Sequence, residues 1–174
     1  MGPGTRTGPS RRGNFHRRLL QRRQLRAAVA GGTGGALFIT THPAMGASSW
    51  QSIRLPAAWR VSSLDGVSCF AGGCVAVSHA GEILSASDPT VPSSWHRVAA
   101  GQPLAAVACS PSGGLCAAVD GDRVFTTHHP MAPAPVWHEY HAGNPYLRLV
   151  TASCPTHSFC LAGDQGGYGA FYQG

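Results

Sequence analysis

The chain contains no lysine and few charges of either sign: charged residues make up 11% of its 174 residues, less than half the usual share. Aromatic residues account for only 8%. No run of about eighteen apolar residues occurs, so we expect no membrane span. Two cysteines separated by two residues, the spacing that zinc sites favour, are also missing. These absences argue against a membrane-spanning protein and a zinc site.

The formal charge of +6 belongs to the N-terminal end of the chain. Residues 1–26 carry eight of the thirteen arginines and no acidic residue, whereas residues 27–174 have five arginines and seven acidic residues, a net charge of −2. A uniformly basic domain would indicate a nucleic-acid partner, but here the larger part is mildly acidic. We therefore interpret 1–26 as a disordered Arg-rich tail or an export n-region, and we expect no nucleic-acid partner.

Glycine and proline are abundant, with 23 and 13 residues, which favours short strands and tight turns over long helices. Three segments run from a glycine turn through a short apolar stretch and Ser or Thr to a proline and then a tryptophan. They begin at Gly35, Gly81 and Gly121, and their tryptophans are Trp50, Trp95 and Trp137. The tryptophans are 45 and 42 residues apart, and we expect them to pack between neighbouring sheets.

Paired cysteines are a second marker with the same period. They lie in the stretches LDGVSCFAGGCVAVS, LAAVACSPSGGLCAAVD and LRLVTASCPTHSFCLAGD. The first cysteines of the pairs are 40 and 45 residues apart, and the second cysteines are 42 and 44 residues apart. Two independent markers that share one period indicate tandem repeats.

Period-two alternation divides one repeat into four strands. We predict strands at 64–69, 74–78 and 82–87, a proline-containing loop at 88–94, and a fourth strand from Trp95. Four short antiparallel strands in about 40–45 residues is the size of one β-propeller blade. We therefore predict an all-β, propeller-type fold of three to four units, incomplete at both ends. The units are approximately 27–60, 61–102, 103–146 and 147–174.

The repeat resembles that of uncharacterised, secreted actinobacterial β-propeller-like proteins. The resemblance rests on the cysteine pair followed by a glycine turn, an apolar pair, Ser or Thr, Asp-Pro or His-Pro, and a tryptophan. The second half also resembles a degenerate Asp-box of sialidase and sortilin-type propellers, with Asp88 and Trp95 closest to the pattern. Ala86 stands where the box serine belongs, and His42 and His129 replace the Asp in the other segments. The box glycine is absent from all three segments.

The cysteines of each pair face one another across a predicted hairpin. Cross-strand Cβ atoms lie about 4.5–5.5 Å apart, which needs little closing to reach disulfide geometry. This favours disulfides over metal ligation or free buried thiols. The predicted bonds are Cys69–Cys74, Cys109–Cys116 and Cys154–Cys160. Because disulfides persist outside the reducing cytoplasm, we predict an extracytoplasmic, secreted protein.

Both ends of the chain fall inside a unit. Ala28 occupies the position equivalent to Cys74, so the first unit lacks a disulfide, and the last unit ends before its tryptophan. Closed propellers usually contain four to eight blades. We expect either a piece of a longer protein or an open stack that self-associates with another copy through its free sheet edges.

The start of the chain has two interpretations. Ser10–Phe15 resembles a twin-arginine export signal, with a cleavage site after Ala47. However, Phe38–Pro43 matches Phe125–Pro130, which favours a repeat that begins near Gly35.

No set of residues indicates catalysis, a cofactor or a metal. The adjacent His128 and His129 occupy a turn position, and His138 and His141 fall on opposite faces of one strand. The seven carboxylates are scattered, whereas acid/base catalysis needs two that converge. We therefore expect no catalytic, cofactor-binding or metal-binding residues.

These observations lead to a non-enzymatic extracytoplasmic repeat module that binds a protein or a glycan, or serves as a scaffold, through its blade loops. The alternative is a fragment of a sialidase-type propeller glycoside hydrolase, which would need paired carboxylates and an arginine cluster. The five arginines outside the tail recur near strand ends without an evident trio.

Overall fold

The computed structural model describes residues 36–40, 42, 45–59, 61 and 63–174. The Arg-rich tail, the export-like motif Ser10–Phe15 and Ala28 lie outside these residues. The described residues form β-strands and no α-helix, so the all-β fold class is confirmed. Within this described part, short 3-10 helices occupy the loops Ala47–Ser49, Ala57–Trp59 and Pro92–Ser94.

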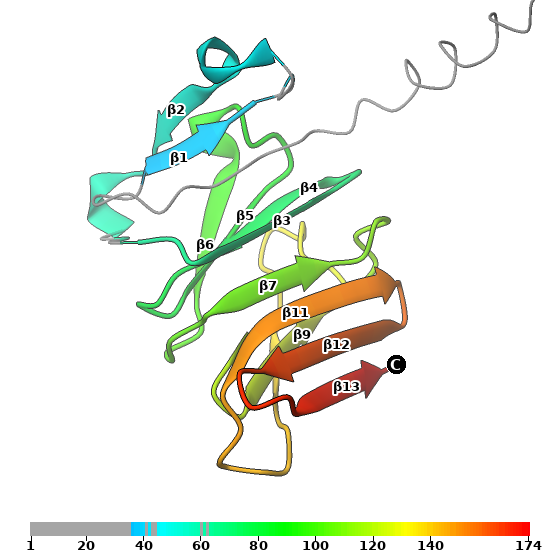
Figure 1. Cartoon of the computed structure of the whole chain (residues 1–174). Coiled ribbons are helices and arrows are strands. Elements are labelled where there is room, and N and C mark those ends of the chain that lie inside the picture. The colour runs from blue at the N-terminus through cyan, green and yellow to red at the C-terminus, as the bar shows by residue number, and fades with distance from the viewer. Residues whose placement is uncertain (1–35, 41, 43–44, 60, 62) are drawn as a thin grey trace, which may run out of the picture.

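Among the described residues, thirteen strands form four antiparallel sheets in chain order (Figure 1). The first sheet pairs β1 (Ala36–Ile39) with β2 (Gln51–Arg54). The second contains β3 (Gly66–Phe70), β4 (Gly73–Val77), β5 (Glu82–Ala86) and β6 (Trp95–Ala99). The third contains β7 (Ala106–Cys109), β8 (Cys116–Asp120), β9 (Arg123–Thr127) and β10 (His138–His141). The fourth contains β11 (Leu149–Thr156), β12 (Phe159–Asp164) and β13 (Gly169–Gln173).

Each sheet lies inside one of the predicted units, and the strands of the second sheet begin and end within two residues of their predicted positions. The first sheet contains two strands and the last contains three. In terms of the four-stranded repeat, β1 and β2 are equivalent to β5 and β6, and β11–β13 are equivalent to β3–β5. The limits of the units between the sheets stay a prediction.

The sheets pack face to face, with a separate apolar core at each of the three junctions. β4 contributes to two of these cores. Cys74 and Ala76 face the β1–β2 sheet, while Val75 and Val77 face the β7–β10 sheet, and all four side chains are fully buried. This division follows from the two-residue period of a strand. An inner sheet must therefore be apolar on both faces, which explains the unbroken Val and Ala runs of β4 and β8.

The first strands of the three larger sheets lie side by side, with β7 between β3 and β11 (Figure 1). The Cys109 backbone N–H in β7 donates a hydrogen bond to the Ser68 hydroxyl in β3, at 2.9 Å. Gly66 permits this close approach, because a Cβ at that position would lie 3.0 Å from the Val107 backbone nitrogen. One long edge of each larger sheet is thus brought toward the same region.

Gly73 provides a test of the hairpin geometry between β3 and β4. Its φ of +147° disfavours other residues, and an added Cβ would overlap the Ala86 carbonyl oxygen on β5. We predict that Gly73→Ala lowers the free energy of unfolding by at least about 2 kcal/mol, measured by urea denaturation. The control is Gly101→Ala, with φ +72° and nothing within 4 Å of the added atom, which should cost only about 1 kcal/mol. Equal losses would contradict the packing of β4 on β5.

Candidate functional site

The structure contains the three predicted disulfides, and no described cysteine is free. Each bond joins the first two strands of its sheet and faces the sheet that comes before it in the chain. Cys74 lies in the core shared with β1–β2, Cys116 in the core shared with β3–β6, and Cys160 in the core shared with β7–β10. Each disulfide is therefore part of a junction between sheets. Stable disulfides of this kind are typical of oxidising compartments.

In the second sheet, the first disulfide and Trp95 belong to one row of side chains that lie next to each other on successive strands. Cys69 pairs in register with Cys74, and Ala86 pairs with Cys74 on one side and Trp95 on the other. The Trp95 side chain is 3% exposed, and its indole N–H donates to the Pro89 carbonyl oxygen at 3.2 Å. Trp95 packs in the same core as the disulfide, against the β1–β2 sheet.

The third sheet repeats this row and ends it with Trp137. Cys109 pairs with Cys116, and Cys116 pairs with Thr127. Trp137 directly precedes β10 and packs against the core shared with β3–β6, where its indole N–H is buried without a hydrogen-bond partner. Trp50 precedes β2 in the same way and is half-buried. Trp95 thus packs in the core shared with the first sheet, and Trp137 packs against the core shared with the second.

The histidines and carboxylates of the described residues form no cluster of three that could hold a metal ion. His128 Nδ1 lies 2.9 Å from the Gly114 carbonyl oxygen, and the His129 backbone N–H donates to the Thr127 hydroxyl. Both histidines are therefore engaged in the loop that leaves β9. In the same part of the chain, no helix has the length and apolar character needed to cross a membrane.

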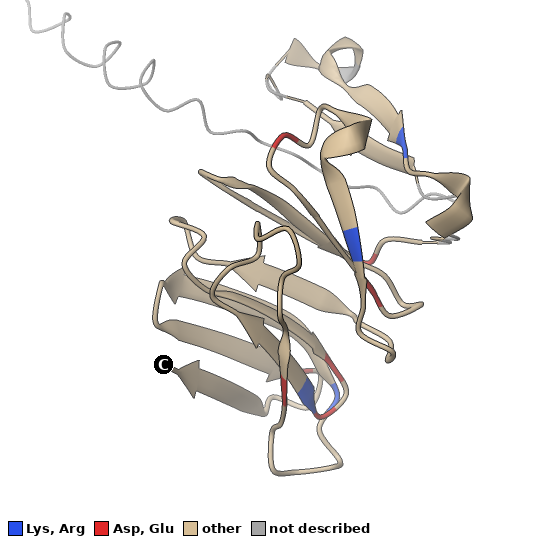
Figure 2. Ribbon diagram, turned by 180° about the vertical axis from the view of Figure 1, so that it is seen from behind, with Lys and Arg blue, Asp and Glu red and all other residues tan. Residues whose placement is uncertain are grey.

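Two Arg–Glu ion pairs occupy equivalent places in the second and third sheets. Glu82 at the start of β5 contacts Arg97 in β6 at 3.0 Å, and Arg123 at the start of β9 contacts Glu139 in β10 at 2.6 Å. In the second sheet the third strand carries the Glu and the fourth strand carries the Arg, whereas in the third sheet the two residue types are reversed. Figure 2 shows few charged residues along the described ribbon, with several of both signs close together at its lower end. Partly exposed pairs contribute about 1 kcal/mol or less each, which fits a supporting role in the sheets.

A third pair joins the turn before β9 to the end of β10. His141 Nδ1 lies 2.9 Å from Asp122 Oδ2. The hydrogen bond from His141 lowers the pKa of the Asp122 carboxyl below its ordinary value, and the positive charges of His141 and Arg123 act in the same direction. The His141 side chain is 60% exposed, so this pair is a surface feature.

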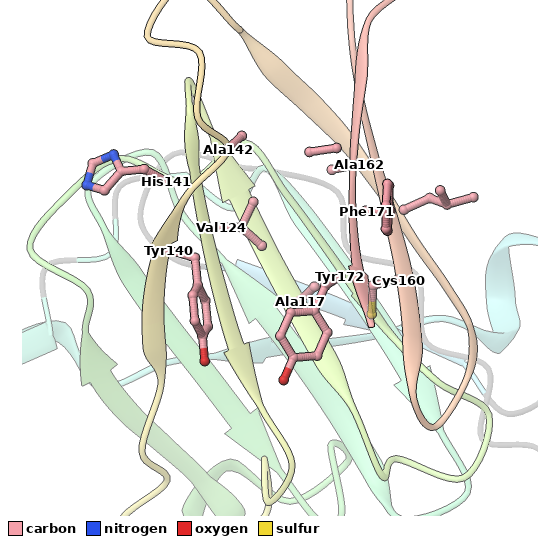
Figure 3. A pocket seen from close by; sticks show the side chains of 11 residues that line it. Ala117, Val124, Tyr140, His141, Ala142, Cys160, Ala162, Phe171 and Tyr172 are labelled. Carbon is pink, nitrogen blue, oxygen red and sulfur yellow. The ribbon is translucent and has the colours of Figure 1, made fainter. Parts of the chain in front are cut away.

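An apolar cavity of about 230 Å³ lies between the third and fourth sheets (Figure 3). Ala117 and Val124 belong to its wall on the third sheet, and Ala170 belongs to its wall on the fourth. Tyr140 of β10 and Tyr172 of β13 border it from opposite sheets, with ring centroids 5.8 Å apart. The lining is mostly aliphatic and aromatic, which suits an apolar or aromatic group.

The exposed side of the β11–β13 sheet carries the apolar residues Leu161 and Phe171, which also border this cavity. Leu161 and Phe171 pair with each other in register and are 47% and 73% exposed. The positions equivalent to Leu161 in the other sheets, Val75 and Ala117, are buried against the next sheet. Phe159 lies 6.5 Å from Phe171 between ring centroids. No described sheet covers this face.

Sequence reasoning did not identify the cavity or its two tyrosines. A signal was present in the repeat, because Tyr172 stands where Ala86 and Thr127 stand in the other sheets. A large ring at a position that is otherwise small indicates a different environment. Recognising that environment required knowing that β10 and β13 lie near each other, which the repeat pattern does not reveal.

A scan against protein-family models found no match, and a search of curated proteins found no match either. The resemblance to secreted propeller-like repeats therefore stays a prediction.

The Asp122–His141 contact predicts a pH-dependent signature. A carboxyl with a pKa lowered by folding adds stability above its unfolded pKa, and this contribution is lost as the pH falls through the folded pKa. We expect ¹³C NMR to show Asp122 titrating below the ordinary value of 3.8, and His141→Gln to raise that pKa toward 3.8. His138→Gln, at the other end of β10, is the control and should leave Asp122 unchanged. An Asp122 titration that does not respond to His141→Gln would refute the contact.

Proposed function

We propose that the chain is a non-enzymatic, extracytoplasmic module of the β-propeller type that binds a protein or a glycan. The side-by-side arrangement of β3, β7 and β11 supports the propeller type. A propeller places four-stranded sheets around a central channel, so that equivalent strands of successive blades are neighbours. The two complete sheets, β3–β6 and β7–β10, have the strand number and order of such blades.

The disulfides support an extracytoplasmic location. All three join hairpin strands and lie within the cores between sheets, so each junction is packed around a formed disulfide. Closing a loop of this length stabilises a fold by roughly 2–2.5 kcal/mol on the chain-entropy model. A reducing cytoplasm would remove that contribution from three successive sheets.

The exposed apolar face of the β11–β13 sheet is the observation that carries the binding role. Leu161 and Phe171 pair across β12 and β13 and are 47% and 73% exposed, and the Phe159 ring centroid lies 6.5 Å from that of Phe171. Apolar side chains that gather on one surface of a protein mark an interaction site more often than isolated ones do. This face therefore favours recognition of another molecule over a purely internal structural role.

The two glutamate pairs favour binding over glycoside hydrolysis. Arg97 and Arg123 each hold a carboxylate of their own sheet, at 3.0 and 2.6 Å. A sialidase-type site needs arginines that converge on the carboxylate of the substrate. These two arginines belong to separate sheets and are engaged in equivalent structural pairs.

The test combines an activity assay with a binding assay on the purified full chain. We expect no release of 4-methylumbelliferone from its α-sialoside at acidic or neutral pH. We expect saturable binding to a glycan array or to a cell-surface protein fraction, weakened at least tenfold in the double variant Leu161→Ser, Phe171→Ser. Val136→Ser is the matched control, because Val136 is 64% exposed but lies outside the β11–β13 sheet.

Turnover of the sialoside would overturn the non-enzymatic assignment. Binding that depends on Val136 as much as on Leu161 and Phe171 would show that the β11–β13 face is not the recognition surface. The absence of saturable binding both to the glycan array and to the cell-surface protein fraction would contradict a binding module.

A further inference from the structure

Two loops at one end of the fourth sheet border an open cleft of about 410 Å³. One loop leads from β10 into β11, and the other is the turn that joins β12 to β13 (Figure 1). The two loops meet because Leu149 at the start of β11 pairs in register with Asp164 at the end of β12. The volume lies within the range of about 300–1,000 Å³ that is usual for small-ligand sites. The polar and aromatic side chains that line the cleft are Asn144, Tyr146, Arg148, Asp164, Gln165 and Tyr168.

The two tyrosines of this cleft are highly exposed. Tyr146 in the first loop is 89% exposed, and Tyr168 in the second is 69% exposed. A ring that stays in water gives up the burial by which aromatic side chains usually stabilise a fold, so these two rings contribute little to the packing of the sheets. Exposed tyrosines are typical of recognition surfaces, because the ring offers a large contact area at a low cost in conformational entropy.

The repeat shows that Tyr146 is an addition to its loop. Residues 100–104 read Ala-Gly-Gln-Pro-Leu, whereas residues 142–147 read Ala-Gly-Asn-Pro-Tyr-Leu. Both glycines have a left-handed backbone, with φ +72° at Gly101 and +79° at Gly143, and the leucine that ends each segment is buried. The shorter loop therefore closes in the same way without a tyrosine. Since the loop does not require Tyr146 in order to fold, a role in recognition is favoured.

Hydrogen bonds hold the backbone of both tyrosines in place. The Asn144 side-chain oxygen accepts a hydrogen bond from the Tyr146 backbone N–H at 3.0 Å. Asp164 Oδ1 accepts one from the Tyr168 backbone N–H at 2.8 Å, and the Asp164 backbone N–H donates to the Tyr168 carbonyl oxygen at 2.9 Å. Next to Tyr146, the buried Leu147 anchors the first loop. A site that is held in shape before binding loses less conformational entropy when a ligand arrives.

The polar side chains around the two rings supply both donors and acceptors. Asn144 and Gln165 carry amides that donate and accept, Arg148 donates, and Asp164 accepts. The charges of the one arginine and the one aspartate in this lining balance each other. This balance disfavours a nucleic acid, whose phosphates need an excess of basic side chains. It suits the hydroxyl groups of a sugar, because each hydroxyl both donates and accepts.

We propose that this cleft binds a neutral oligosaccharide. The apolar C–H face of a pyranose ring stacks on Tyr146 and Tyr168, and its hydroxyls form hydrogen bonds with the polar side chains beside them. A proline-rich peptide can also dock on aromatic rings, but it offers few donors for Asp164 and the amides. The proposal rests on the proposed function, because it names one ligand class of the binding module and places that ligand apart from Leu161 and Phe171.

The probes are arrayed neutral tetrasaccharides of glucose, mannose, galactose and N-acetylglucosamine, tested with the purified full chain. We expect at least one of them to bind saturably, and saturation-transfer NMR to show contact at its ring C–H protons. Tyr146→Ala and Tyr168→Ala should each weaken this binding at least about tenfold, because each removes one stacking ring. Tyr146→Phe restores the ring and should bind at least about fivefold more tightly than Tyr146→Ala.

Two controls separate the cleft from other exposed apolar side chains. Val136→Ala changes a residue that is 64% exposed in the loop before β10, and it should leave binding of the tetrasaccharide unchanged. The double variant Leu161→Ser, Phe171→Ser should also keep this binding, because neither residue lines the cleft. Circular dichroism and intact mass in the absence of reductant establish that each variant keeps the sheets and the disulfides.

The proposal fails if no tetrasaccharide binds saturably, or if binding is unaffected by both alanine variants of the tyrosines. It also fails if a proline-rich peptide binds through Tyr146 and Tyr168 while the sugars do not. Failure of sugar binding leaves the proposed function standing as long as the cell-surface protein fraction binds through Leu161 and Phe171. Turnover of the sialoside, in contrast, removes the non-enzymatic assignment without affecting the cleft.

Discussion

The arrangement depends on one constraint: an inner sheet with neighbours on both sides must bury both of its faces. Apolar burial contributes about 25 cal/mol per Å², and in β4 the constraint yields a strand in which every residue is buried. Small residues are needed as much as large ones, because Ala76 and Ala117 allow the adjacent sheets to approach. A charge or a large polar side chain at these positions would leave a junction without its core. The low charge content of the chain is therefore a consequence of the stacked sheets.

The disulfides and tryptophans are the strongest elements of this arrangement. Each described row starts at a hairpin disulfide and crosses the sheet on the face that meets the preceding sheet. The disulfide holds the first two strands together, and the tryptophan anchors the outermost strand to the same junction. Where Tyr172 stands in place of the small residue of the other sheets, the junction between the third and fourth sheets contains a cavity. The same row thus fastens each of the two four-stranded sheets to the sheet that precedes it.

The sequence was sufficient to predict the strands, the turns and the disulfides, because these are local features with local markers. Cysteines and glycines mark the ends of hairpins, and the alternation of side chains marks the strands between them. It was not sufficient to predict which strands of different sheets meet. The approach of β3 to β7 depends on Gly66, and the cavity depends on Tyr140 and Tyr172 meeting across a junction. Neither the approach of these strands nor the cavity can be inferred from the spacing of the repeats. The two Arg–Glu ion pairs could not be predicted either, because an alignment of the repeats places residues of opposite charge, Glu82 and Arg123, at one position.

Intact mass spectrometry with alkylation tests the central claim most directly, namely that each of the three larger sheets contains its own disulfide within a junction core. The account predicts that the native full chain takes up no iodoacetamide without reductant and takes up six equivalents after reduction and unfolding. Peptide mapping should then connect only cysteines of the same hairpin. Alkylation of the unreduced protein, or a bond between cysteines of different hairpins, would contradict an arrangement of face-to-face sheets that each contain their own hairpin disulfide.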